Sequence, residues 1–150
     1  MLTALLSTDR STTRLFQRVL LGLVMLPHGL QKTAGWFGGG GFTETMAMLT
    51  GPLGMPAVLA LLVIAAETAG AVALVAGFAT RLSALGVAAV MVGAVLVAHV
   101  PNGFFMNWGG TQAGEGFEYH LLALALALPL VVAGGGARSL DGWLSRPAAA

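Results

Sequence analysis

The sequence predicts an all-α membrane protein, a bundle of four transmembrane helices with both termini in the cytoplasm. Two observations carry this prediction. Hydrophobic residues make up 57% of the 150 residues, only 9% are charged, and the mean hydropathy is +0.86, which leaves too little polar surface for a soluble globule of this size. Apolar stretches of roughly 20 residues, the length needed to cross a bilayer core of about 30 Å, recur along the chain.

We expect one membrane domain over residues 1–150, with spans at about residues 14–35, 56–78, 81–99 and 117–134. Polar or glycine-rich stretches follow these spans, among them residues 38–41, 101–103 and 134–136, and such residues end helices. The first span follows basic residues as a signal peptide would, but no small-x-small cleavage site follows it. We therefore expect it to remain in the membrane.

Basic residues give the expected orientation, because Lys and Arg are retained on the cytoplasmic side of a membrane. With four alternating spans, Lys32 lies alone on the outer side. The cytoplasmic side then holds the arginines, which are Arg10, Arg14, Arg18, Arg81, Arg138 and Arg146.

Charge and composition exclude several classes of function. A formal net charge of +1 without a basic patch gives no surface for a nucleic-acid partner. The absence of cysteine excludes disulfides, thiolate metal sites and iron–sulfur ligation by this chain. The histidines have no ligand-type spacing, so we expect no metal site and do not expect haem. No nucleophilic triad, phosphate loop or HExxH pattern is present.

Ionisable residues inside the spans are the functional candidates, since they are costly in lipid and usually face the bundle interior. Glu67 lies near the middle of the second span. It is either a carboxyl that handles protons or binds a ligand, or one half of a structural ion pair. In the first span, residues spaced three or four apart predict one inward stripe, formed by Arg14, Arg18, Gly22, Met25, Gly29 and Lys32.

A polar cluster is expected at the outer end of the bundle, where His99 ends the third span and Glu118 begins the fourth. His28 and Lys32 belong to the same end. Glu118 and His120 are two residues apart and cannot share a helical face. We expect Glu118 to line the cluster, and we interpret His120 and its neighbour Tyr119 as interfacial anchors.

These residues, taken in order, resemble the DoxX family over residues 14 to 144. The resemblance rests on Arg14, Gly22, His28-Gly29, Lys32, Glu67-x-x-Gly70, Gly77-x-x-Thr80-Arg81, Met91, His99-Val-Pro-Asn-Gly-Phe-Phe105 and Gly116-Phe-Glu118-Tyr119. It implies a compact four-helix protein of the bacterial inner (cytoplasmic) membrane. The family takes its name from a subunit linked to quinone-dependent oxidation of reduced sulfur compounds. Without cysteine, any sulfur chemistry has to take place elsewhere.

The resulting hypothesis is a small redox-associated subunit that binds a quinone between its helices. We expect His28, Lys32 and Asn102 to bind the cofactor, and Glu67, His99 and Glu118 to act as catalytic, proton-transferring residues. The chain has no electron donor of its own, so we expect a redox partner protein, and we leave open a homo-oligomer. The alternatives are a membrane scaffold or assembly factor with a purely structural polar cluster, and a small transporter or channel component.

Overall fold

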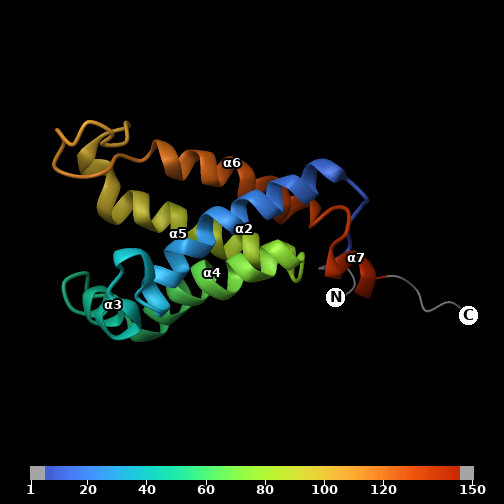
Figure 1. The fold of residues 1–150 in the computed structure, drawn as a ribbon, viewed down its shortest axis with the longest axis horizontal. Helices are drawn as coiled ribbons and strands as arrows, with labels where there is room; N and C mark the ends of the chain where they lie inside the picture. Colours follow the sequence, from blue (N-terminus) through green and yellow to red (C-terminus); the bar gives the residue numbers. More distant parts are fainter. Residues whose placement is uncertain (1–5, 146–150) are drawn as a thin grey trace, which may run out of the picture.

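The computed structural model describes residues 6–145 of the chain, and this part is helical with no β-strand. Figure 1 shows the long helices lying side by side along one long axis, with short helices at the two ends. In chain order they are α2 (Thr12–Thr33), η1 (Trp36–Gly38), α3 (Gly41–Thr50), α4 (Ala57–Ala76), α5 (Thr80–Ala94), the π-helical turn η2 (Val95–His99), η3 (Val100–Asn102), α6 (Glu118–Ala133) and α7 (Leu140–Leu144).

Each expected span corresponds to a helix whose ends lie within two residues of the expected bounds, once η2 is added to α5. Two helical stretches are long and apolar enough to cross a membrane, Ala57–Ala76 and the continuous Thr80–Asn102. The helix α2 carries three basic residues, and α6 has 16 residues, or roughly 24 Å at 1.5 Å per residue. The four-span arrangement and the cytoplasmic position of the termini stay predictions.

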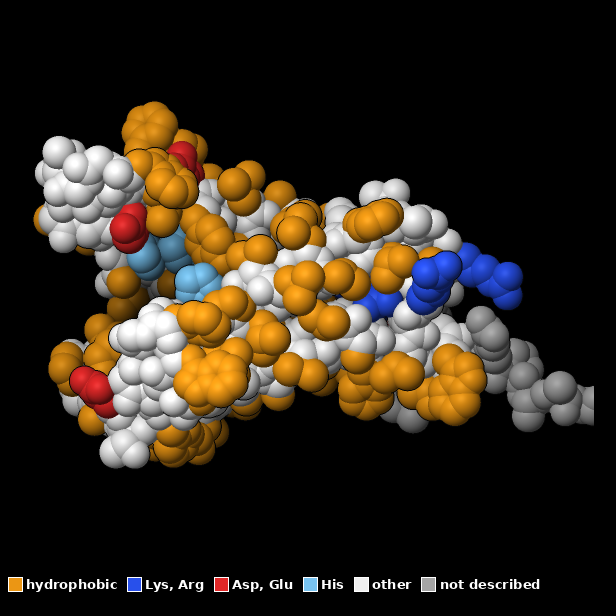
Figure 2. Space-filling model, in the orientation of Figure 1, with side chains coloured by type: hydrophobic (Ala, Val, Ile, Leu, Met, Phe, Trp, Pro, Cys, Tyr) orange, Lys and Arg blue, Asp and Glu red, His pale blue; other side chains and the backbone are white. Residues whose placement is uncertain are grey.

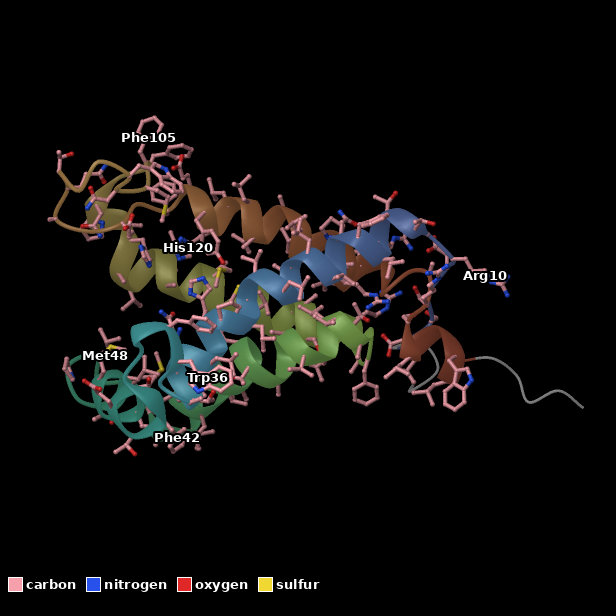
Figure 3. All side chains as sticks on the ribbon, viewed as in Figure 1. Arg10, Trp36, Phe42, Met48, Phe105 and His120 are labelled. Atoms are coloured by element: carbon pink, nitrogen blue, oxygen red, sulfur yellow. The ribbon has the colours of Figure 1, made fainter. Side chains whose placement is uncertain are left out.

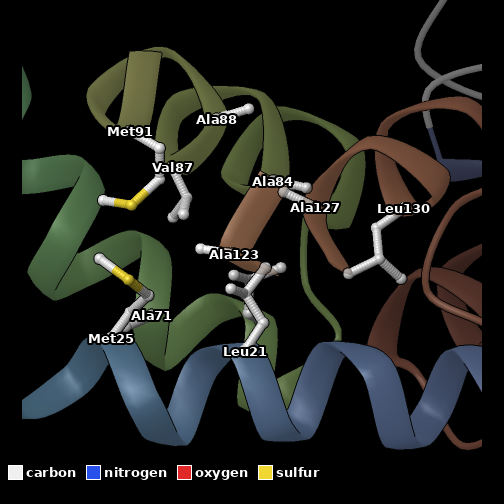
Figure 4. Close-up of a cluster of buried hydrophobic side chains, with 11 residues drawn as sticks. Leu21, Met25, Ala71, Ala84, Val87, Ala88, Met91, Ala123, Ala127 and Leu130 are labelled. Atoms are coloured by element: carbon white, nitrogen blue, oxygen red, sulfur yellow. The ribbon is translucent and has the colours of Figure 1, made fainter. Parts of the chain in front are cut away.

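The helix α2 packs most extensively against α4, while α5 lies between α4 and α6. The buried residues of α2 are Arg18, Leu21, Gly22, Met25 and Gly29. This confirms that the predicted stripe on the first span faces inward over most of its length. The central core contains side chains from α2, α4, α5 and α6 (Figure 4). They are Leu21, Met25, Ala71, Leu74, Ala84, Val87, Ala88, Met91, Ala123, Ala127 and Leu130.

Two glycines on α2 set the close contact with α4. A Cβ added at Gly29 would lie 2.4 Å from the carbonyl oxygen of Glu67, and one at Gly22 would lie 2.7 Å from that of Ala71. Both distances are far below van der Waals contact, so a side chain at either position would force the helices apart. Glu67 is thereby held close to the last turns of α2.

Arg18 holds the opposite end of the bundle together and is 1% exposed. Within the described part of the chain, its guanidinium donates hydrogen bonds to backbone carbonyls alone. The acceptors lie at the end of α4 and in the segment that follows α6, namely Leu74, Val75, Gly135, Ala137 and Arg138. These carbonyls belong to the last turn of α4 and to the segment after α6, and helix ends leave carbonyls without a regular intrahelical partner.

Other charged side chains cap helices at the same end. The buried carboxylate of Asp141 accepts from the backbone N–H groups of Ala79 and Thr80, at 2.7 and 2.8 Å, and so caps the start of α5. The guanidiniums of Arg14 and Arg81 donate to carbonyls in the last turn of α6. Asp141, Arg14 and Arg81 therefore stabilise helix ends at the end of the bundle where the sequence predicted the basic residues to gather.

Charge is distributed unevenly along the bundle. Figure 2 shows the blue basic side chains at the α7 end, and the red acidic and pale blue histidine side chains at the other end. Arg146, which the expected orientation also used, lies outside the described residues. The first and last described segments lie together at the basic end, where the backbone N–H of Ala137 donates to the carbonyl of Ser11.

Candidate functional site

The candidate site begins with an ion pair between two helices. The Nζ of Lys32, in the last turn of α2, donates to the Oε2 of Glu67 on α4. The Glu67 side chain is 6% exposed and the Lys32 side chain 24%. The contact gives Glu67 the structural partner that one of the two sequence interpretations required, and it also places a cation beside the bundle interior.

His28 lies one turn before Lys32 and is exposed. Its ring centroid is 5.8 Å from that of Tyr119, at the start of α6. The Tyr119 hydroxyl donates to the sulfur of Met25 at 3.5 Å, and a thioether is a weak acceptor. The charges of both Lys32 and Glu67 act on His28, so these groups form one electrostatic neighbourhood.

His99 and His120 bring two imidazole rings together, with centroids 4.1 Å apart. His99 is the last residue of the π-helical turn η2, and such turns inside helices occur frequently at functional sites. His120 is 6% exposed, and its Nδ1 is buried without a hydrogen-bond partner among the described residues.

The expectation that Glu118, and not His120, lines the cluster is wrong. The Glu118 Oε1 accepts from the backbone N–H of Met106 at 2.9 Å and from the Nε1 of Trp108 at 3.3 Å. Because α6 starts at Glu118, its side chain reaches back to the preceding loop. A rotation of two residues then turns His120 toward the interior.

The side chain of Asn102 also hydrogen-bonds backbone near the loop. Its Nδ2 donates to the carbonyls of Ala98 and Glu115, at 3.2 and 3.1 Å. The same Glu115 carbonyl lies 2.8 Å from the Nδ1 of His99. Asn102 and Glu118 thus shape the loop over residues 103–117, and His99 links that loop to the polar cluster.

We define the polar cluster as Lys32, Glu67, His28, Tyr119, His120 and His99. It lies at the end of the bundle where two connecting segments, residues 34–56 with the short helix α3 and residues 100–117, extend beyond the long helices (Figure 1). Figure 2 shows a hollow between these regions with the histidine side chains at its inner end. In Figure 3, His120 points into the bundle while Phe105 projects away from it.

The structure brings together Lys32, Glu67, His28 and His99 of the predicted site residues, and it leaves Asn102 and Glu118 outside. Their functional roles stay predictions. Sequence reasoning missed the capping role of Asp141 and the place of His120 in the cluster. For Asp141, the preceding Ser139 gave a helix-start signal, and the Ser139 hydroxyl does accept from the N–H of Gly142.

Two apolar grooves lie elsewhere, on the outer faces of α4. One, of about 500 Å³, runs between α4 and α5 and is lined by residues such as Ala66, Gly70 and Gly86. The other is bordered by α3 and α4 and includes Phe42 and Ile64. Neither is lined by a member of the polar cluster. Within residues 6–145, no three His, Asp or Glu side chains are arranged to hold a metal ion.

Comparison with known proteins agrees with the resemblance inferred from the sequence. The family model DoxX matches residues 13–100, more than half of the chain. A curated relative from Bacillus subtilis (strain 168), named "Putative oxidoreductase CatD", is 28% identical over 116 residues, which cover 77% of this chain and 76% of the relative. No solved structure gives a significant match. The chain belongs to the DoxX family, whose members are membrane-integral proteins.

Proposed function

We propose that this protein is a small multi-pass subunit of the bacterial inner membrane that binds a quinone, or a similar apolar carbonyl-bearing ligand, at the polar cluster. It supports electron and proton transfer together with a partner protein. Its helices α2, α4, α5 with η2, and α6 are the four spans of one membrane domain, and both termini lie in the cytoplasm. The polar cluster then lies near the outer surface of the membrane.

The observation that carries this proposal is the combination, at one place, of a buried ion pair and hydrogen-bonding groups that lack good partners. Lys32 and Glu67 satisfy each other, whereas Tyr119 donates to a thioether and His120 Nδ1 has no partner within residues 6–145. Buried polar groups in folded proteins are generally paired. Thr80 Oγ1 and Arg81 Nε at the opposite end of the bundle also lack partners among the described residues. His120 differs from them because it lies in the polar cluster with the Lys32–Glu67 ion pair, and a binding site keeps such groups for its ligand.

The surroundings fit an apolar ligand with polar ends. Met25, Met91 and Ala123 belong to the buried core that Tyr119 packs against, and ligand sites are mostly apolar with a few placed polar groups. A bound quinone would supply two-electron, two-proton redox chemistry. The chain's own residues would bind and orient it: Lys32 supplies positive potential, and His28 a ring nitrogen.

Proton transfer to the outer surface is assigned to the histidines. His99 is half-buried and contacts the loop carbonyl of Glu115, so it lies between the buried His120 and the outer solvent. The family match and the relative named as an oxidoreductase support the redox role. No described residue is an evident electron carrier, so electrons have to pass between the ligand and a partner protein.

The test is direct binding of short-chain ubiquinone and menaquinone analogues to purified protein in detergent. We expect saturable binding by the wild-type protein, weakened at least tenfold in Lys32→Met. Glu44→Gln is the control, because Glu44 is an exposed acid on α3 and is not a member of the polar cluster. Absence of saturable binding of either analogue to well-folded protein would contradict the proposal.

The scaffold alternative rests on a specific observation, the ion pair that joins α2 to α4. If Glu67→Gln and His99→Ala leave quinone-analogue binding and redox activity intact in membranes but abolish assembly with the partner, the polar cluster is structural. The quinone proposal requires the opposite pattern, with binding lost while the variants still insert and assemble.

A further inference from the structure

We propose that His120 is the residue that hydrogen-bonds the ligand's oxygen in both its oxidised and its reduced form, by exchanging the proton between its two ring nitrogens. This inference rests on the proposed function, since it assigns a contact within the same site. The ligand class is an apolar ring whose oxygen is a carbonyl in one state and a hydroxyl in the other. A carbonyl oxygen only accepts a hydrogen bond, whereas a hydroxyl also donates one.

His120 carries a buried ring nitrogen that makes no hydrogen bond among the described residues. His120 is 6% exposed, and its Nδ1 is buried without a partner. Among residues 6–145, no hydrogen bond reaches either of its ring nitrogens; its described contacts are with the rings of His99 and Tyr119. An unsatisfied buried group costs free energy comparable to a lost hydrogen bond. A ligand oxygen at this position would remove that cost.

The neighbouring ring of His99 differs from that of His120, because one of its nitrogens has a hydrogen-bond partner. The Nδ1 of His99 lies 2.8 Å from the backbone carbonyl of Glu115. A carbonyl can only accept, so this nitrogen carries the proton, and in the neutral ring the other nitrogen is bare. The tautomer of His99 is therefore fixed by the loop. The tautomer of His120 is fixed by nothing described, although the two rings are 4.1 Å apart.

Tyr119 lies beside His120, with ring centroids 5.5 Å apart. Its hydroxyl donates to the Met25 sulfur at 3.5 Å, a weak bond that a ligand oxygen would replace at little cost. Tyr119 also faces His28. The start of α6 thus presents two adjacent side chains that can hydrogen-bond the ligand in either state. Of these, the Tyr119 hydroxyl already has a weak acceptor, whereas the buried Nδ1 of His120 has no partner among the described residues.

The experiment measures the ring nitrogens themselves. Full-length protein labelled with ¹⁵N-histidine is recorded by NMR with no ligand, with decylubiquinone, and with decylubiquinol, and the His120 signals are identified by their absence in His120→Asn. We expect Nδ1 of His120 to carry the proton with the quinone and to be bare with the quinol. His99 should keep its proton on Nδ1 in all three samples. A His120 tautomer that is the same in both liganded samples would overturn the inference.

Binding measurements separate this inference from the proposed function. We expect His120→Phe, which removes both nitrogens, to weaken decylubiquinone and decylubiquinol by about tenfold or more each. His120→Asn, which keeps a donor and an acceptor, should retain more binding than His120→Phe. If the wild-type protein binds both forms and His120→Phe binds them equally well, only the present inference fails. If the wild-type protein binds neither form, the proposed function fails with it.

Discussion

The ion pair between Lys32 and Glu67 can be dissected by a double-mutant cycle with Lys32→Met, Glu67→Gln and the double variant. The two side chains differ in exposure, 24% for Lys32 and 6% for Glu67. Removing one partner of a buried pair costs about 3–5 kcal/mol, because it leaves the other charge uncompensated. The single variants should therefore differ according to which charge is left behind.

Lys32→Met leaves the buried carboxylate of Glu67 and should cost about 3 kcal/mol, the lower end of that range. Glu67→Gln leaves an ammonium that can extend toward water from the end of α2, so we expect a smaller cost of about 1–2 kcal/mol. The double variant should cost less than the sum of the two, with a coupling free energy of about 2 kcal/mol.

The assay is equilibrium unfolding in mixed micelles by SDS titration, followed by far-ultraviolet circular dichroism. Glu44→Gln on the exposed face of α3 is the control and should change the free energy of unfolding by no more than about 0.5 kcal/mol. Additive costs, or a larger cost for Glu67→Gln than for Lys32→Met, would refute the reasoning, because they would show that the pair is not the contact that stabilises the two helices.

Three further predictions use the same preparations. Arg18→Lys should lower the free energy of unfolding by about 3 kcal/mol or more in the same titration, since each hydrogen bond to a charged group contributes about 1.5–3 kcal/mol. An ammonium has three donors for the five carbonyls that the guanidinium reaches. A cost below about 1 kcal/mol would contradict the role given to these hydrogen bonds. Gly29→Ala should separate α2 from α4, since its Cβ would collide with the backbone of Glu67. It should therefore lower both the free energy of unfolding and the binding of quinone analogues. The control is Gly93→Ala, which should lower neither, because a Cβ at Gly93 would meet open space. The proposed orientation can be tested by tryptophan fluorescence in proteoliposomes, with variants that keep only Trp108 or only Trp143. Lipids brominated near the headgroups should quench both variants, whereas an aqueous quencher added outside right-side-out vesicles should quench Trp108 alone. Quenching of Trp143 from outside would overturn the proposed orientation.

Local sequence patterns were enough to predict the helices and the inward face of α2. Apolar run length and three-or-four-residue spacing are local properties, so the expected spans differ from the helices by no more than about two residues, and the stripe from Arg18 to Gly29 is buried as predicted. The ordered motif also identified the family, since it consists of residue types at fixed places along the chain.

The tertiary structure decided which groups meet. Arg18 donates to carbonyls that lie 56 to 120 residues away, and no local pattern marks such acceptors. The start of α6 at Glu118 decided that His120, and not Glu118, faces the cluster, since a shift of a single residue in a helix turns every side chain by about 100°. Side-chain direction at a helix end depends on loop contacts, and those contacts exist only once distant segments have packed together.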